Sequence, residues 1–166
     1  MDKMKVAIVG KVHQKGLEFL KENEFEVLEL SNFDDQILKN ELKFVDGILL
    51  RTTKLGESVL SHCTNLKIIS RHGVGYDNVD IDYLNRNKIA LGITSTSNAV
   101  SVAEHVMSFF IYLTKNLSLS DSLVKQGNFE RKSELPNFFE LFEKKVLIVG
   151  FGRIGKEVAK RCQGFD

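Results

Sequence analysis

The chain has 166 residues, of which 43% are hydrophobic and 27% are charged, and these are ordinary values for a globular protein. Its 23 basic and 22 acidic residues leave a net charge of +1, which gives no electrostatic basis for binding nucleic acid or an anionic membrane. The two cysteines, Cys63 and Cys162, have no metal-binding or redox spacing, and with no apolar targeting segment in view they predict a cytoplasmic protein.

Strand and helix patterns alternate along the chain up to residue 93. Short apolar or alternating runs predict strands at residues 5–9, 26–30, 47–50, 66–70 and 89–93. Helices are predicted between them, at residues 14–22, 34–42, 57–62 and 80–87, and Asp34 and Asp80 are candidate N-caps. Short strands that alternate with helices at this spacing favour an α/β fold with a parallel sheet and helices on both faces.

A glycine-rich turn, RHGVGYDNVD at residues 71–80, follows the fourth predicted strand. Ligands bind at the carboxyl ends of strands in open α/β sheets. Gly73 and Gly75 permit backbone conformations that expose successive N–H groups, and such a nest holds a carboxylate or a phosphate. The alternative interpretation is a tight turn that leads into the helix capped by Asp80.

Residues 101–126, from Ser101 to Gln126, contain no glycine or proline and predict one long helix of about 39 Å at about 1.5 Å per residue. Its first half is apolar nearly all round, so it must be covered on more than one side. The longest apolar stretch, residues 99–113, is too short to span a bilayer and indicates a buried helix. Gly127 is expected to end the helix, and a loop is expected at residues 127–135.

A second glycine motif, GFGRIG at residues 150–155, stands between a predicted strand at 145–149 and a predicted helix that runs to about Gln163. This is the context of a dinucleotide-binding loop. Gly150 permits the tight turn, Gly152 lets the backbone approach the pyrophosphate, and Gly155 lets the helix pack against the strand. The helix N-terminus attracts the phosphates, and Arg153 adds positive charge. The alternative is a tight turn with a structural role only.

The acidic residue that binds the ribose hydroxyls is expected about 20 residues beyond such a loop, at the end of the next strand. Asp166 falls in the turn that leaves the helix, so we do not assign it this role. The choice between NAD and NADP therefore stays open.

Four segments occur together in an informative order: LLRTTKL at 49–55, NLKIISRHGVGYDNVD at 65–80, SNAVSVAEHVM at 97–107 and VLIVGFGRIG at 146–155. They resemble the D-isomer-specific 2-hydroxyacid dehydrogenase family over nearly the whole chain. The resemblance implies a flavodoxin-like parallel-sheet substrate domain at residues 1–98. It implies, at residues 99–166, a long linking helix that packs in a homodimer interface and then the truncated start of a Rossmann NAD-binding domain.

The resemblance also implies binding roles on the substrate side. Gly73 and Val74 match the loop whose backbone amides hold the substrate carboxylate, and Asn98 matches an asparagine that faces the substrate. Arg51 and Lys54 resemble the basic residues that meet the substrate phosphate in phosphoglycerate dehydrogenases. An equally weighted alternative is that Arg51 is a surface or interface cation.

On the cofactor side, the resemblance places Val102 near the nicotinamide of NAD. The pyrophosphate loop is implied at Gly150, Gly152, Arg153, Ile154 and Gly155. The sequence departs from the family pattern at Thr94-Ser95-Thr96-Ser97, where a proline and a glycine usually precede the asparagine, and this weakens any subfamily assignment.

No catalytic residue is assigned to this chain. The family resemblance implies a histidine acid/base, a glutamate that raises its pKa and a substrate-orienting arginine, all located beyond the pyrophosphate loop. None of the chain's own histidines occupies the position of that catalytic histidine; they are His13, His62, His72 and His105.

Two functions therefore compete. The first is a truncated NAD-dependent oxidoreductase for a phosphoglycerate-like 2-hydroxy acid, inactive on its own. The second is a natural short protein that binds a small acid or a partner without catalysis. A flavin carrier is disfavoured, because the turn at residues 10–13 is not rich in Ser, Thr and Gly.

Overall fold

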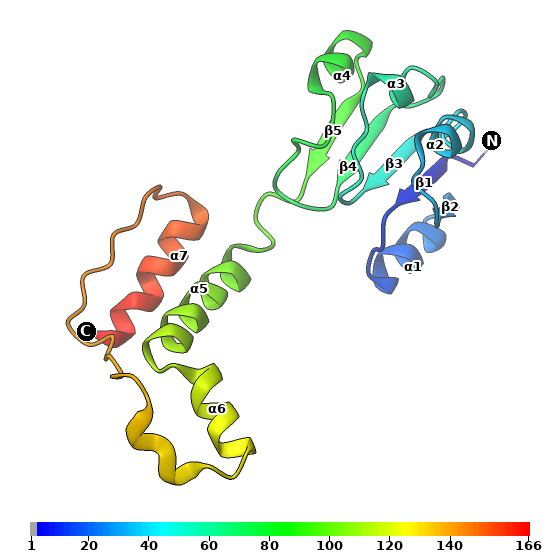
Figure 1. The fold of residues 1–166 in the computed structure, drawn as a ribbon. Coiled ribbons are helices and arrows are strands. Elements are labelled where there is room, and N and C mark those ends of the chain that lie inside the picture. The colour runs from blue at the N-terminus through cyan, green and yellow to red at the C-terminus, as the bar shows by residue number, and fades with distance from the viewer. Residues whose placement is uncertain (1–2) are drawn as a thin grey trace. The chain divides into compact units, whose positions relative to one another are not determined.

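The computed structural model of the protein describes residues 3–166, and for Phe129 the backbone alone. The chain divides into two compact units, the sheet unit up to Ser95 and the helical unit Thr96–Asp166 (Figure 1). Each unit has its own packing and is described separately.

The sheet unit contains, within the described residues, a five-stranded parallel sheet. Its strands are β1 (Lys5–Val9), β2 (Glu26–Leu30), β3 (Gly47–Leu50), β4 (Ile68–Arg71) and β5 (Ala90–Ile93). They are ordered β2-β1-β3-β4-β5. This is the flavodoxin-like order. The chain first adds β2 on one side of β1 and then adds β3, β4 and β5 on the other side, so the switch point lies between β1 and β3. The predicted α/β class and flavodoxin-like fold are confirmed.

The crossover helices begin where their capping residues indicate. They are α1 (Gln14–Glu22), α2 (Asp35–Glu41), α3 (Glu57–Leu60) and α4 (Ile81–Asn87). Asp34 Oδ1 accepts a hydrogen bond from the Gln36 N–H at 2.9 Å, and Asp80 Oδ1 accepts one from the Tyr83 N–H at 2.9 Å. Both predicted N-caps are confirmed, and each satisfies a donor that the first helical turn leaves unpaired.

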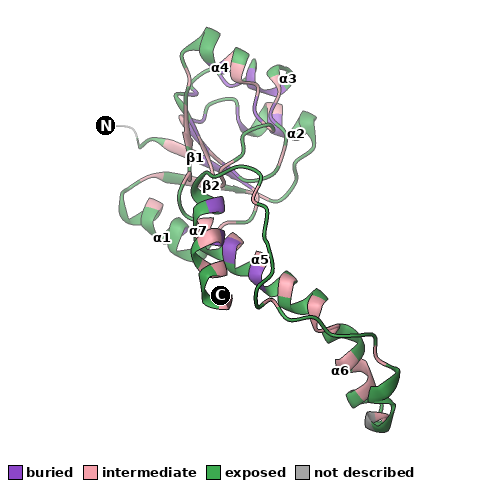
Figure 2. Ribbon diagram, turned by 90° about the vertical axis from the view of Figure 1, so that its left-hand side faces the viewer, coloured by how far each residue is buried: buried purple, intermediate pink, exposed green. Residues whose placement is uncertain are grey.

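The hydrophobic core lies between one face of the sheet and helices α2, α3 and α4. Successive side chains in a strand point to opposite faces, so alternate residues of β1, β3 and β4 enter this core. Figure 2 shows the buried residues concentrated there. The buried cluster includes Ala7, Val9, Ile48, Leu50 and Ile69 from the strands, and Leu38, Leu42, Val59, Leu60 and Leu84 from the helices.

The opposite face of the sheet is covered less completely. Among the described residues of the sheet unit, α1 is the helix that packs on it, and a cavity of about 360 Å³ opens beside α1. Val6 and Leu49 line this cavity together with Ile68, whose side chain is 44% exposed. Side chains on this face are therefore less completely buried than those that face α2, α3 and α4, and each should contribute less to stability.

Asp46 holds three strands in register at their amino ends. Its carboxylate accepts hydrogen bonds from the Lys5 N–H at 2.9 Å and from Lys67 Nζ at 2.7 Å. The Lys67 ammonium and the Lys5 N–H hold the pKa of the Asp46 carboxyl below its usual value. The residue just before β3 is thereby tied to β1 and to the segment that enters β4.

The helical unit corrects the prediction of one helix from Ser101 to Gln126. The structure has α5 (Ala99–Thr114) and α6 (Leu117–Lys125). Asn116 separates them with a left-handed backbone at φ 47°, a conformation that asparagine tolerates better than most residues. The Thr114 hydroxyl also donates to the Phe110 carbonyl at 2.7 Å, a local bond that competes with helix continuation.

The predicted strand at residues 145–149 is also wrong. The segment pairs with no strand of the described chain, and Leu147 and Val149 are 88% and 92% exposed. A strand needs neighbours that accept and donate its backbone hydrogen bonds, and one strand with one helix does not make a sheet. The predicted loop at 127–135 contains a 3-10 helix, Phe129–Glu134, in which the Arg131 guanidinium Nε donates to both Glu134 carboxylate oxygens at 3.0 Å.

Helix α7 (Arg153–Cys162) packs against α5 and gives the helical unit its core. At its C-terminus α7 continues as a short 3-10 helix, Gln163–Phe165. The two helices are joined by Arg161, which pairs with Glu157 at 2.6 Å on α7 and with Glu104 at 3.3 Å on α5. The buried residues between them are Ala103, Met107, Gly155 and Val158.

The asymmetry of the sheet predicts different costs for two neighbouring substitutions. Ile69→Ala removes a fully buried side chain from the core and should lower the free energy of unfolding by about 2–5 kcal/mol. Ile68→Ala, on the less covered face, is the control and should cost about 1 kcal/mol. Urea unfolding followed by far-UV circular dichroism measures both, and equal losses would contradict the burial described here.

Candidate functional site

The carboxyl ends of β1, β3 and β4 are aligned at one edge of the sheet. Val9, Leu50 and Arg71 are partners in the parallel register. The ladder continues one residue further, since the Arg51 N–H donates to the Val9 carbonyl at 3.0 Å and the His72 N–H donates to the Leu50 carbonyl at 2.8 Å. This edge includes the switch point between β1 and β3, where ligands bind in folds of this order.

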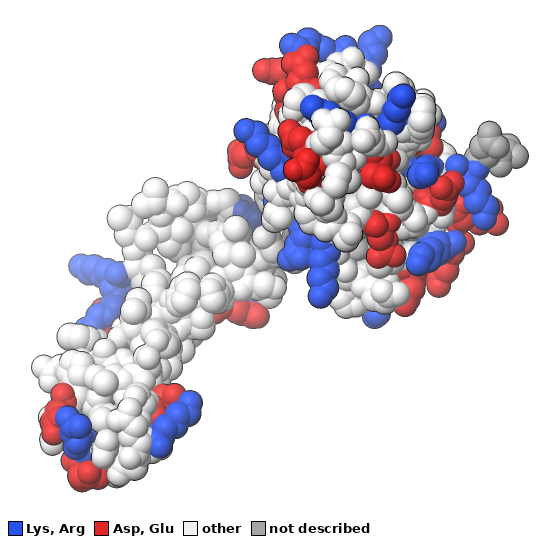
Figure 3. All heavy atoms as spheres, turned by 45° about the vertical axis from the view of Figure 1, so that its right-hand side comes forward, with Lys and Arg blue, Asp and Glu red and all other residues white. Residues whose placement is uncertain are grey.

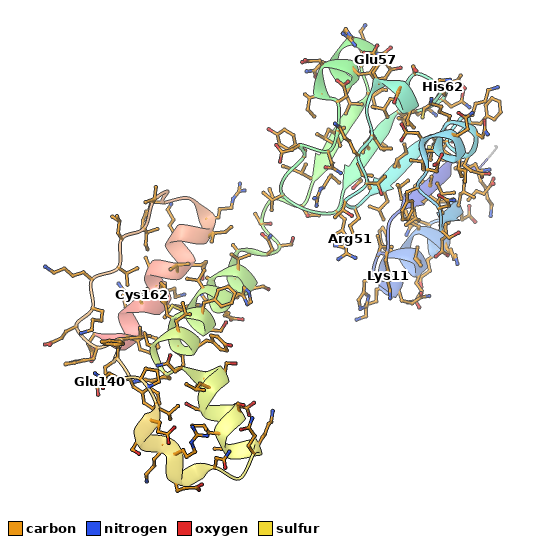
Figure 4. The ribbon with its side chains drawn as sticks, in the orientation of Figure 1. Lys11, Arg51, Glu57, His62, Glu140 and Cys162 are labelled. Atoms are coloured by element: carbon orange, nitrogen blue, oxygen red, sulfur yellow. The ribbon has the colours of Figure 1, made fainter. Side chains whose placement is uncertain are left out.

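Arg51 stands at that switch point, immediately after β3. Its guanidinium donates a hydrogen bond from NH1 to the Lys11 carbonyl at 3.0 Å, while most of the side chain is exposed. Figure 4 shows Arg51 and Lys11 at the same edge of the sheet unit. A guanidinium held in this way keeps further N–H donors free to face an anion, because the group carries five donors in a planar fork.

The Gly73 loop lies beside Arg51, at the end of β4. Gly73 has φ +155°, its N–H donates to the Arg71 carbonyl at 2.9 Å, and its own carbonyl accepts from the Thr94 N–H at 3.1 Å. Within the described residues, the N–H groups of Val74 and Gly75 donate to no protein acceptor. Two successive unpaired N–H groups in a turn are a suitable cradle for a carboxylate.

Two further residues at this edge have roles that sequence analysis did not assign. The Asn78 side-chain amide donates to the Thr53 carbonyl at 2.8 Å and so holds the turn after β3 against the turn after β4. Arg71 folds over the Gly73 loop, where its guanidinium occupies the space that a Cβ on Gly73 would fill. A signal for Arg71 was present in the sequence, as a basic residue directly at a predicted strand end.

The electrostatics of this edge are local. Figure 3 shows acidic and basic side chains interspersed over the visible face of the sheet unit, so no broad field of one sign covers it. The basic residues Arg51 and Lys54 follow β3, and Arg71 ends β4. Cys63 is not a nucleophile for this site, because burial in the core raises the pKa of its thiol to about 11.

The second glycine loop, residues 150–155, belongs to the helical unit and leads into α7. Gly150 has φ +93°, and Gly152 is the extended N-cap of α7 with no atom within 4 Å of a Cβ built on it. At Gly155 a Cβ would lie 2.4 Å from the Gly150 carbonyl oxygen. Gly155 therefore packs closely against the loop, whereas the strand against which the sequence placed it does not form.

The remaining residues singled out in the sequence also lie in the helical unit. Asn98 is the N-cap of α5, although its side chain makes no capping hydrogen bond, and Val102 is half-buried in the first turns of that helix. Arg153 and Ile154 begin α7. Arg51, Gly73 and Val74 thus share one edge of the sheet unit, whereas the cofactor-side residues form a separate group in the helical unit.

No helix within residues 3–166 is long and apolar enough to cross a membrane. The described part of the chain also groups no three His, Cys, Asp or Glu side chains in a way that would hold a metal ion.

The strand order and the ligand edge define a doubly wound α/β protein of the flavodoxin-like type. A family model described as D-isomer specific 2-hydroxyacid dehydrogenase, catalytic domain, matches residues 6–165. The chain therefore belongs to the D-isomer specific 2-hydroxyacid dehydrogenase family, which confirms the resemblance noted in the sequence.

Similar proteins agree with this assignment. D-3-phosphoglycerate dehydrogenase of Archaeoglobus fulgidus is 32% identical over 98% of this chain and 31% of its own length. The crystal structure of D-lactate dehydrogenase from Aquifex aeolicus, complexed with NAD and lactic acid, matches with a TM-score of 0.83 and 29% identity over 97% of this chain and 48% of that one. The crystal structure of an NADPH-dependent glyoxylate/hydroxypyruvate reductase from Sinorhizobium meliloti, in complex with NADP and malonate, matches with a TM-score of 0.85 and 25% identity. The match covers 99% of this chain and 51% of that one.

The chain thus spans between 31% and 51% of the length of these three proteins.

The close packing at Gly155 generates a prediction. Gly155→Ala places a methyl group against the Gly150 carbonyl, so α7 should lose about 1–3 kcal/mol of local stability. Hydrogen exchange of the α7 amides measures this loss. Gly164→Ala, where nothing lies within 4 Å, is the matched control, and similar exchange rates in both variants would show that the contact is unimportant.

Proposed function

We propose that the chain supplies the substrate-binding part and the pyrophosphate loop of a cytoplasmic NAD-dependent D-2-hydroxyacid dehydrogenase. The reaction interconverts a 2-hydroxy acid and a 2-keto acid, and the substrate we favour is phosphoglycerate-like. The observation that carries the proposal is the placement of Arg51 and the Gly73–Val74 turn on neighbouring strands at one edge of the sheet.

A phosphorylated hydroxy acid has two anionic groups and needs two separate binding positions. The sequence assigned the carboxylate to the amides of Gly73 and Val74, but the Gly73 N–H donates to the Arg71 carbonyl. The N–H of Val74 and that of Gly75 have no protein acceptor within the described residues, so these two suit the carboxylate. Arg51, one strand away, suits the phosphate, because a guanidinium recognises planar pairs of anionic oxygens with two parallel hydrogen bonds. Asn98, at the start of α5, is our candidate for a further substrate contact from the helical unit.

The glycine loop fits the pyrophosphate of a dinucleotide, because its turn, its open N-cap and its close helix packing are all formed. Hydride transfer to and from the substrate C2 is the chemistry that the bound dinucleotide would supply. The residues of this chain would hold the pyrophosphate at the N-terminus of α7, where the helix dipole favours negative charge. Arg153 would add positive charge, and Val102 would pack near the nicotinamide. Related structures with NAD or NADP support a nicotinamide cofactor for the family.

Oxidation of the substrate also releases the hydroxyl proton, and we assign no residue of this chain to accept it. The histidine acid/base, its glutamate and the substrate-orienting arginine are expected in the part of the relatives that this chain does not span. Proton transfer from a positioned group accelerates such reactions by about 10²–10⁴. The substrate-binding edge alone is therefore insufficient for turnover.

A second candidate function is a non-catalytic module that binds a small acid or a partner. The specific observation in its favour is the pair of unpaired N–H groups at Val74 and Gly75, which belong wholly to the sheet unit. It uses the same carboxylate turn but requires neither cofactor nor proton transfer.

The 166-residue chain should be catalytically silent. We expect no NAD(H) binding by calorimetry and no turnover of phosphoglycerate, glycerate, lactate or formate, because the pyrophosphate loop is one of several contacts that a dinucleotide needs. A nicotinamide absorbance assay should compare this chain with a version extended to the full length of its relatives. Turnover by the extended version alone supports the dehydrogenase, whereas acid binding without turnover by either supports the module. Activity of the short chain above a Gly152→Val control would contradict the prediction.

We also propose a homodimer through the region from Ser101 to Gln126. Much of the visible surface of the helical unit is uncharged (Figure 3). Its exposed apolar side chains on α5 and α6 include Phe109, Ile111, Tyr112, Leu113, Leu117 and Leu119. A two-fold interface is the commonest way to cover such a surface.

Light scattering at micromolar concentration should give the mass of two chains. Phe109→Glu should shift the mass towards one chain, because it places a charge in the apolar contact. Phe44→Glu changes a similarly exposed phenylalanine of the sheet unit and serves as the control. A monomeric mass for the unaltered chain would refute the dimer.

A further inference from the structure

Gly10 is the residue that follows β1, and it lies directly against Arg51. Its φ is +115°, in the region that favours glycine, and a Cβ built on it would lie 2.7 Å from Arg51 Cβ. The neighbouring backbone is fixed by the bond from the Arg51 N–H to the Val9 carbonyl at 3.0 Å. The two residues therefore face each other across the switch point with no room for a methyl group.

The same turn also contacts the far end of the Arg51 side chain. The Lys11 carbonyl, one residue after Gly10, accepts the hydrogen bond from Arg51 NH1 at 3.0 Å. The turn after β1 thus contacts Arg51 twice, at Cβ and at the guanidinium. Both contacts come from the backbone of residues 10 and 11.

We propose that Gly10 is a positioning residue that sets the direction of Arg51 and thereby the preference for a phosphorylated over an unphosphorylated 2-hydroxy acid. The inference rests on the proposed function, in which Arg51 receives the substrate phosphate. Gly10 itself touches no substrate. Its contribution is the absence of a Cβ, which allows Arg51 to leave β3 close to the turn and to reach the Lys11 carbonyl.

The physical reason is that the clash at this position has no cheap relief. The atom that a new methyl group would meet is a Cβ, which is anchored to the β3 backbone and cannot rotate away as a side-chain end can. An alanine would in addition be strained at φ +115°. The turn must then move away from β3, and the Lys11 carbonyl moves with it, so the guanidinium loses its fixed direction.

The test is a nuclear magnetic resonance titration of the ¹⁵N-labelled 166-residue chain with 3-phosphoglycerate, D-glycerate and inorganic phosphate. The variants are Gly10→Ala, Arg51→Gln and Gly16→Ala. Gly16 lies in α1, a Cβ there has nothing within 4 Å, and its substitution is the matched control. We expect Gly10→Ala to lower the affinity for 3-phosphoglycerate about tenfold, as for the loss of one charge-assisted contact. The affinity for D-glycerate should change by no more than about twofold.

The possible results separate the inference from the proposed function. If Arg51→Gln and Gly10→Ala both lower phosphate selectivity and Gly16→Ala does not, the positioning role is supported. If Arg51→Gln lowers selectivity and Gly10→Ala leaves it unchanged, the positioning role is overturned while the proposed function stands. If Arg51→Gln leaves selectivity unchanged, or the unaltered chain binds no phosphorylated ligand, the phosphate-binding role that the proposed function gives to Arg51 fails, and the inference fails with it.

A thermal unfolding cycle keeps the contact testable if Gly10→Ala folds poorly. Arg51→Gly removes the Cβ that the new methyl group would meet, so Gly10→Ala should lower the melting temperature less in the Arg51→Gly background than alone. Contacting residues show such coupling, whereas independent ones have additive effects. Equal decreases in the two backgrounds would overturn the proposed contact.

Discussion

The parallel pairing of β1, β3 and β4 is the constraint on which the proposed substrate-binding edge depends. Because the three strands run in the same direction and in register, the residues that follow them meet at one edge. Arg51 and the Gly73 turn are separated in sequence but become neighbours through this pairing. The Asp46 carboxylate supports the alignment from the other end of the same strands, through Lys5 and Lys67.

Glycine has a different physical task in each of the two loops. At Gly73 the missing side chain leaves room for the Arg71 guanidinium and lets the turn present its N–H groups. At Gly155 it allows a helix to approach the Gly150 carbonyl. Both uses are steric, yet the first shapes the turn that we propose as a binding surface and the second shapes an internal contact. The sequence motif alone does not distinguish them.

The two units differ in how completely their local patterns are satisfied. In the sheet unit every predicted strand finds a parallel neighbour, and the buried cluster is continuous. In the helical unit, residues 145–149 have a strand-like sequence but no partner within the described chain, so Leu147 and Val149 remain exposed. The unit is held instead by α5 against α7, with Arg161 linking the two helices.

Local chemistry was sufficient to determine much of this protein from its sequence. Alternation of apolar residues predicted the sheet strands, the carboxylates of Asp34 and Asp80 marked helix starts, and the order of four motifs indicated the family, because each depends on neighbours in sequence. The tertiary structure alone decided which strands pair, that Arg51 faces Gly10 and Lys11, and that residues 145–149 form no strand. Those outcomes depend on contacts between distant segments, or on the absence of a hydrogen-bonding partner within the described residues, and a local pattern contains no information about either.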